Sequence, residues 1–207
     1  MKKLVVLLPV LSGVLWGSAG VFVRDLTEMG MDDYTLLSSR MIVAAAVVFL
    51  GICLYDRSLL KIRRKDLWIF LGGGVLGMLG LSFCYNIAIS QLTLSLAAVL
   101  LSLSPVFVLL LSAVLFREKV TGRKVGCMAA ALAGCALASG VLESASGMQW
   151  TVSGILIGLM GAFFYGLYSI FTKVAMERGY HSFTIILYCM AVVALVLLPF
   201  TDWEFLG

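Results

Sequence analysis

The sequence predicts an all-α integral membrane protein with about seven transmembrane helices. Hydrophobic residues make up 62% of the chain, its mean hydropathy is +1.09, and only 13% of its residues are charged. Soluble domains are typically about 45–50% apolar. The apolar runs lack the strict alternation that strands of a closed barrel would need, so we interpret them as helices.

Seven apolar runs are long enough to be spans, and they cover residues 4–23, 35–55, 68–89, 93–116, 124–141, 152–172 and 183–200. The first run, "MKKLVVLLPVLSGVLWGSAG", has features of a secretory signal peptide. It continues through "VFV" to a spanning length of about 20 residues, so we interpret it as a retained helix. The third and fourth runs are separated by the short "SQLT" and are expected to form a tight hairpin.

Loop charges predict that the N-terminus is cytoplasmic. Thirteen of the 15 basic residues lie at the N-terminus or after the even-numbered spans: Lys2, Lys3, Arg57, Lys61, Arg63, Arg64, Lys65, Arg117, Lys119, Arg123, Lys124, Lys173 and Arg178. The opposite loops contain one basic residue, Arg24, among several acidic ones. The positive-inside rule therefore places the first group in the cytoplasm and predicts a multi-pass protein of the cytoplasmic (inner) membrane. The basic residues form no stripe, so we expect no nucleic-acid partner.

One stretch of sequence recurs 149 residues later. Residues 20–35, "GVFVRDLTEMGMDDYT", resemble residues 169–184, "SIFTKVAMERGYHSFT". Residues 13–47 and 162–196 share nine identities at this offset, among them Glu28/Glu177, Gly30/Gly179 and Thr35/Thr184. The second copy begins five spans after the first. Because five is an odd number, the second copy is upside down in the membrane. Inverted repeats are typical of secondary transporters, whose substrate site lies between the repeats.

Several stretches, taken in order, resemble a known family. They are "GVLWGSAGVFVRD", "LSSRMIVAAAVV", "LGGGVLGMLGLSFCYNIAI" and "SLAAVLLSLSPVFVLLLSAVLFREKVTGRKVGCMAAALAGCAL". This order resembles the EamA-type transporters of the drug/metabolite transporter superfamily, whose members have ten helices in two inverted five-helix repeats. The resemblance implies a complete first repeat over residues 1–141 and a partial second repeat over residues 152–207, in which three helices of the family pattern are missing.

Charged candidates for a substrate pathway lie within or at the ends of the spans. Arg40 lies about a turn and a half into the second span, where it faces either a polar pathway or the membrane interface. The second repeat has Cys189 at this position. Arg24 and Lys173 occupy equivalent positions at the ends of the first and sixth spans, either as pathway residues or as interfacial anchors. Glu118, flanked by Arg117 and Lys119, is expected to be part of a solvated cluster.

Aromatic and polar candidates complete the predicted pathway: Trp16, Phe83, Tyr85, Asn86, Tyr165, Tyr168 and Thr172. They line an amphipathic cavity or contribute to packing. Pro105 removes a backbone hydrogen bond in the middle of the fourth span, where Ser102 and Ser104 can satisfy the freed groups. The pairs Gly73/Gly77 and Gly154/Gly158 are expected to let helices approach closely.

The sequence contains no catalytic or metal-binding pattern. The chain has one histidine, five cysteines without a CxxC motif, and no Asp or Glu deep in a span. We therefore expect no enzyme activity, no metal and no cofactor.

We predict a transporter that moves a small metabolite, such as an amino acid, a nucleoside-like or a drug-like compound, by alternating access and in the direction of export. The alternative is a truncated or helper membrane protein without transport activity of its own. Its expected partners are the lipid bilayer and the small-molecule substrate. Two further partners are left open: a second copy of the chain, in a homo-oligomer, or a completing subunit.

Overall fold

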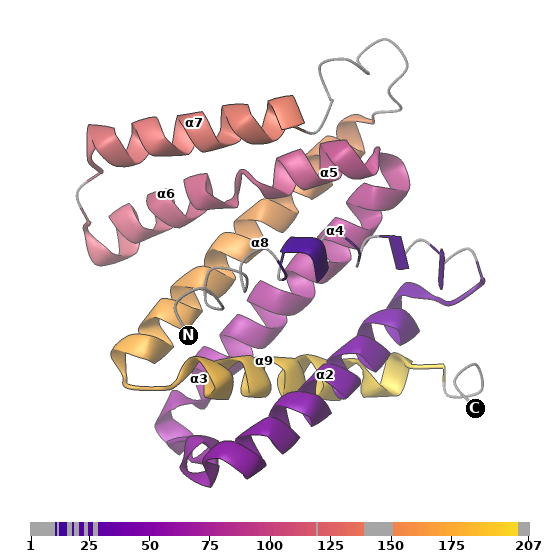
Figure 1. Ribbon diagram of the computed structural model, residues 1–207, viewed down its shortest axis with the longest axis vertical. Helices are drawn as coiled ribbons and strands as arrows, with labels where there is room; N and C mark the ends of the chain where they lie inside the picture. The colour runs from indigo at the N-terminus through magenta and orange to yellow at the C-terminus, as the bar shows by residue number, and fades with distance from the viewer. Residues whose placement is uncertain are drawn as a thin grey trace.

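The computed structural model describes residues 11, 13–15, 18, 21–22, 25–26, 29–118, 120–138 and 151–202 (Figure 1). Most of the first predicted span, with Trp16 and Arg24, lies outside these residues. All regular structure in the described part of the chain is helical. Five of the described helical segments are long and apolar enough to cross a membrane, which agrees with an all-α membrane protein: Tyr34–Tyr55, Arg64–Gln91, Leu94–Phe116, Val152–Glu177 and Ser182–Phe200.

Helix α2 spans Asp33–Tyr55 and confirms the second predicted span. Gly30 precedes it with a φ of 94°, a backbone conformation that favours glycine. The Asp32 carboxylate caps the helix by accepting hydrogen bonds from the backbone N–H groups of Tyr34 and Thr35. A hydrogen bond with the Thr35 side chain has the largest effect on the Asp32 carboxyl. Together with the backbone hydrogen bonds, it lowers the pKa of Asp32. Two short 3₁₀ turns, Arg57–Leu60 and Arg64–Asp66, lead to the next span.

The third span is one continuous helical segment with a wider middle. It consists of α3 (Leu67–Leu71), the π-helical segment η3 (Gly72–Leu79) and α4 (Gly80–Gln91). π-helical turns are rare and often lie at functional sites. Here the π-helical turns coincide with the glycine-rich stretch that packs against α8 and α9.

The fourth span is one helical segment, Leu94–Phe116, as predicted, but its α-helical pattern is interrupted inside it. It is divided into α5 (Leu94–Leu101) and α6 (Ser104–Phe116), with a break at residues 102–103. Pro105 lies in the first turn of α6, where its missing N–H costs no hydrogen bond. The Ser102 hydroxyl donates to the Val99 carbonyl at 2.7 Å. Ser102 and Leu103 keep helical dihedral angles, so the proline starts α6 directly after an irregular turn within the span.

Three further helices follow: α7 (Gly122–Ala138), α8 (Val152–Glu177) and α9 (Ser182–Leu197), with a final 3₁₀ turn at Leu198–Phe200. Helix α8 extends five residues beyond the predicted 172. Helix α8 packs against α4, η3, α5 and α6, while α9 crosses α2 and also contacts η3 (Figure 1). Helix α7 contacts α5 at the edge of the bundle, away from α2 and α9.

Glycines allow the closest helix contacts, which confirms the predicted pairs. A Cβ on Gly77 would lie 2.8 Å from the Tyr168 Cα, and one on Gly73 would lie 3.2 Å from the Cys189 Sγ. A Cβ on Gly158 would lie 2.7 Å from the Leu100 side chain. Without side chains at these positions, η3 and α8 approach almost backbone to backbone.

The predicted orientation can be tested by thiol labelling in intact cells. We expect a single cysteine in the Arg57–Lys65 loop, on a background without the five native cysteines, to be shielded from a membrane-impermeant reagent. A cysteine at Asp32 should be labelled. Labelling after permeabilisation controls for buried thiols, and the reverse pattern would contradict the cytoplasmic N-terminus.

Candidate functional site

The last turns of α8 form an open recess of about 510 Å³, here named the α8 recess. Its lining residues are Tyr168, Ser169, Thr172, Lys173, Met176 and Glu177. Three of them, Tyr168, Thr172 and Lys173, were predicted pathway residues. Tyr168 and Thr172 share one face because residues four positions apart lie close together on a helix, and Lys173 follows Ser169 at the same spacing. On the predicted topology this face lies toward the cytoplasmic end of the span.

Lys173 is held by an ion pair at the edge of the recess. Its Nζ donates to the Glu118 carboxylate and lies 4.2 Å from the centre of the Phe116 ring. Glu118 also pairs with Lys124 at 3.5 Å. The hydrogen bond and charge of Lys173 lower the pKa of the Glu118 carboxyl. Glu118 therefore joins the α6–α7 loop to α8, and with its side chain 37% exposed the cluster is also partly solvated.

Two buried polar atoms have no hydrogen-bond partner among the described residues. They are the Thr172 Oγ1, at the α8 recess, and the Asn86 Nδ2, on α4. Asn86 is 8% exposed. A buried polar group without a partner costs about 1–3 kcal/mol, so such groups are uncommon in folded proteins. The Asn86 Nδ2 is available to bind a polar group, and so is the Thr172 Oγ1, which also interacts with the nearby Tyr168 hydroxyl.

The other aromatic candidates lie on several faces. Tyr165 lies one turn before the α8 recess, with its ring centre 6.5 Å from that of Tyr168. Phe83 contacts the cluster between α2 and α9, where its ring lies 5.1 Å from that of Tyr34. Tyr85 instead packs against the cluster formed by α4, α5 and α8. The structure thus brings Tyr165, Tyr168, Thr172 and Lys173 together and places Phe83 and Tyr85 elsewhere.

Arg40 lies on an exposed face of α2 and has no ion-pair or hydrogen-bonding partner within the described residues. Cys189, at the corresponding position of α9, is buried against Phe70, whose carbonyl lies 3.9 Å from the Cys189 Sγ. The two positions therefore have opposite surroundings. Arg40 remains a predicted pathway residue.

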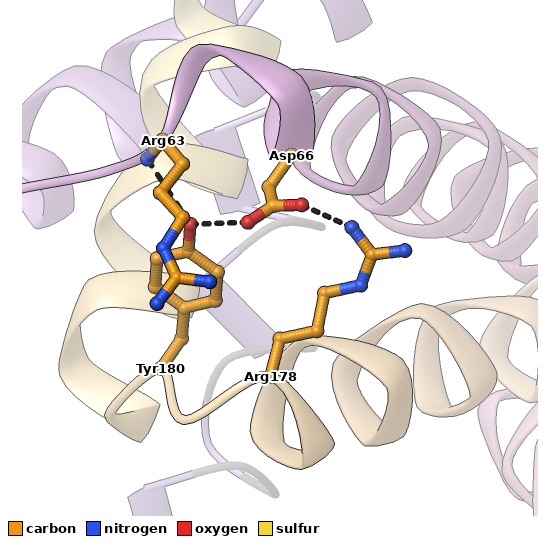
Figure 2. Close-up of polar contacts among 4 residues, drawn as sticks. All are labelled: Arg63, Asp66, Arg178 and Tyr180. Atoms are coloured by element: carbon orange, nitrogen blue, oxygen red, sulfur yellow. Dashed lines mark hydrogen bonds and ion pairs between the residues drawn. The ribbon is translucent and has the colours of Figure 1, made fainter.

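A buried carboxylate at the start of the third span was missed by the sequence reasoning. Asp66 is 3% exposed, and its carboxylate accepts hydrogen bonds from Arg178 and from the Tyr180 hydroxyl, the latter at 2.7 Å (Figure 2). The Arg63 backbone N–H donates to the Tyr180 oxygen at 3.1 Å. A lone acidic residue among basic ones in "KIRRKDLW", directly before an apolar run, is the signal that could have indicated a structural role.

The described residues contain no group of histidine, cysteine or carboxylate side chains that could hold a metal ion. The α8 recess has hydroxyl groups, one lysine and one carboxylate, but no nucleophile paired with a base. This arrangement can bind and orient a small polar molecule.

Residues 3–140 match the model of the EamA-like transporter family. The chain belongs to this family. As an EamA-family member with several helices that can span a bilayer, it is a multi-pass membrane protein. The family and its named relatives point to transport instead of catalysis.

Two curated relatives show how this EamA-family chain compares with longer proteins. An uncharacterized transporter of Bacillus subtilis is 27% identical over 175 residues, which cover 83% of this chain and 54% of the relative. A probable terminal-alkyne amino-acid exporter of Streptantibioticus cattleyicolor is 28% identical over 193 residues, covering 92% of this chain and 61% of that protein. The chain thus spans little more than half the length of these relatives.

The fold of this EamA-family chain also resembles a solved crystal structure. The TM-score is 0.63 at 20% sequence identity, and the alignment covers 93% of this chain and 68% of the other. At this identity the likeness shows the fold alone.

Proposed function

We propose that this EamA-family chain carries a small polar metabolite across the cytoplasmic membrane by alternating access, in the direction of export. The observation that carries the proposal is the α8 recess, with the unpartnered Thr172 hydroxyl beside Lys173 and Tyr168. An unpartnered polar group inside a transmembrane bundle is expensive to keep, and such groups mark substrate paths.

The local geometry of the repeated stretch supports the inverted-repeat mechanism. Gly30 and Gly179, which align at the offset of 149, have φ values of 94° and 86°. Asp32 and His181 then cap α2 and α9 with their side chains, and Thr35 and Thr184 are both buried in the first turn. The same turn thus starts two helices at opposite predicted membrane faces, as an inverted repeat requires.

An amino acid is the first substrate to test, ahead of nucleoside-like and drug-like compounds. The relative from Streptantibioticus cattleyicolor is named a probable exporter of an amino acid. The α8 recess contains both a lysine and a glutamate, Lys173 and Glu177, besides its hydroxyl groups and apolar wall. Such a wall with opposite charges suits a zwitterion with an apolar side chain.

Replacement of Thr172 by valine tests the proposal, because it separates transport from stability. Thr172→Val keeps the shape and removes an unpartnered polar atom, so thermal stability should be unchanged or higher. Transport should fall about two- to tenfold, which corresponds to one lost hydrogen bond of about 0.5–1.5 kcal/mol. Uptake of labelled amino acids into reconstituted vesicles, with melting in detergent, measures both.

Thr184→Val is the matched control. The Thr184 hydroxyl donates to the Leu59 carbonyl at 2.7 Å, so this variant should lose stability. Normal transport of every tested substrate by Thr172→Val would remove the α8 recess from the pathway. Both variants are made in a version completed with the three further helices of the family pattern. A completed wild-type version that transports none of the three substrate classes would contradict the proposed function itself.

A further inference from the structure

The cluster of Asp66, Arg178 and Tyr180 joins helices that belong to different repeats. Asp66 starts the third span, in the first repeat, while Arg178 and Tyr180 lie in the turn between α8 and α9, in the second (Figure 2). The contacts connect residues 112 and 114 positions apart in the sequence. The cluster is therefore a connection between repeats, placed at the predicted cytoplasmic end.

Aromatic side chains surround this cluster and fix its geometry. The Tyr180 ring packs edge-to-face on Phe70, with ring centres 5.2 Å apart. The Arg178 guanidinium lies 5.5 Å from the centre of the Trp68 ring. Both aromatic partners belong to α3, two and four residues after Asp66. The ion pair is thus supported by packing between the same two segments.

The same elements remain in tight contact deeper in the membrane. A Cβ on Gly72 would lie 2.5 Å from the Phe171 ring, and one on Gly74 would lie 3.0 Å from the Cys189 carbonyl oxygen. Farther along, a Cβ on Gly80 would lie 2.9 Å from the Phe164 ring. A close glycine contact between two helix backbones leaves little room for one helix to rotate or slide against the other.

We propose that the Asp66–Arg178–Tyr180 cluster makes the α3–η3–α4 span move with α8 and α9 as one rigid unit during transport. The inference rests on the proposed function, since it concerns the moving parts of that carrier. The units that rock against each other then do not coincide with the sequence repeats: this span of the first repeat travels with the second.

At the other membrane face, the described positions that correspond to Arg178 and Tyr180 have different side chains. At the offset of 149, the positions of Arg178 and Tyr180 correspond to Met29 and Met31. Met29 is 72% exposed and cannot form an ion pair. The polar connection therefore lies at one of the two membrane faces. Asp66 positions Arg178 and Tyr180 there.

A cross-link across the cluster tests whether it opens. Lys65→Cys and Ser182→Cys place thiols next to Asp66 and two residues after Tyr180, both at exposed positions outside the α8 recess. The background is a transport-competent version without the native cysteines, and a short cleavable bis-maleimide is the linker. We expect the cross-linked protein to keep its transport rate to within about twofold. Loss of flux that returns on cleavage of the linker would show that the cluster opens in each cycle and would overturn the proposal.

A charge exchange tests the ion pair in a second readout that needs no transport. Asp66→Arg should lower the melting temperature and the maximal transport rate, and Asp66→Arg with Arg178→Asp should recover part of both. Asp56→Asn is the control and should change neither, because Asp56 is exposed and, among the described residues, its carboxylate accepts hydrogen bonds only from Ser58. An unchanged melting temperature in Asp66→Arg would contradict a rigid connection. Absence of flux in the uncross-linked parent would instead count against the proposed function.

Discussion

Replacement of Gly77 by alanine is expected to reduce the amount of folded protein severely. The added Cβ would lie 2.7 Å from the Tyr168 Cβ, 2.8 Å from its Cα and 3.2 Å from its backbone nitrogen. Two of these neighbours belong to the α8 backbone, so no rotamer change can relieve the contact. Overpacking of this kind costs about 1–3 kcal/mol, and each 1.4 kcal/mol changes the folding equilibrium about tenfold.

The control for this prediction is Gly51→Ala. Gly51 lies in α2, also within a predicted span, and a Cβ there meets nothing within 4 Å. Its melting temperature should be unchanged or slightly higher, because alanine has the better helix propensity. Melting in detergent and membrane abundance measure both variants. Equal stability of Gly77→Ala and Gly51→Ala would show that η3 and α8 do not approach as closely as described.

The spans could be predicted because lipid constrains them strongly. An apolar run in a bilayer must satisfy its backbone internally, so α2, α8 and α9 follow directly from the hydropathy pattern. Their ends are less well determined, and α8 continues to Glu177 because nothing in "KVAME" breaks a helix. The turn at Gly179, with its positive φ, ends it instead.

The interior of the fourth span was harder to predict. The residue pattern indicated Pro105 as a kink, but both a bent helix and two separate helices agree with "SLSP". The outcome depends on tertiary packing, since Ser104 is buried at the start of α6 and α5 packs against α8. No feature of the local sequence indicates this packing.

The candidate site could be predicted only in part, because polar side chains choose partners across long sequence separations. Tyr168 and Thr172 were proposed from helical spacing, and Lys173 from its position in the repeat, which is equivalent to that of Arg24; all three line the α8 recess. The pairing of Lys173 with Glu118 connects residues 55 positions apart, and that of Arg178 with Asp66 connects residues 112 apart. A single sequence contains no record of such pairs. Lys173 was predicted as a pathway residue or an interfacial anchor, and Arg178 was counted only as a loop charge.

The second large effect concerns the polypeptide of residues 1–207 by itself. Helices in lipid have little hydrophobic drive to associate, so an uncovered helix face is tolerated and the described spans should insert on their own. Alternating access demands more, because two bundles must rock around an enclosed site. The α8 recess is open, and the chain matches 54–61% of the length of two transporter-named relatives. We therefore expect residues 1–207 alone to insert with the predicted topology and to catalyse no substrate-specific flux.

Saturable transport in reconstituted vesicles tests the transporter proposal most directly. Residues 1–207 are compared with a version completed by the three further helices of the family pattern, supplied in the same chain or as a separate subunit, with labelled amino acids as the first substrates. The prediction is saturable flux for the completed version, reduced by Thr172→Val, and none for residues 1–207 alone. A completed version that inserts correctly and shows no saturable flux with amino acids, nucleosides or drug-like compounds would contradict it.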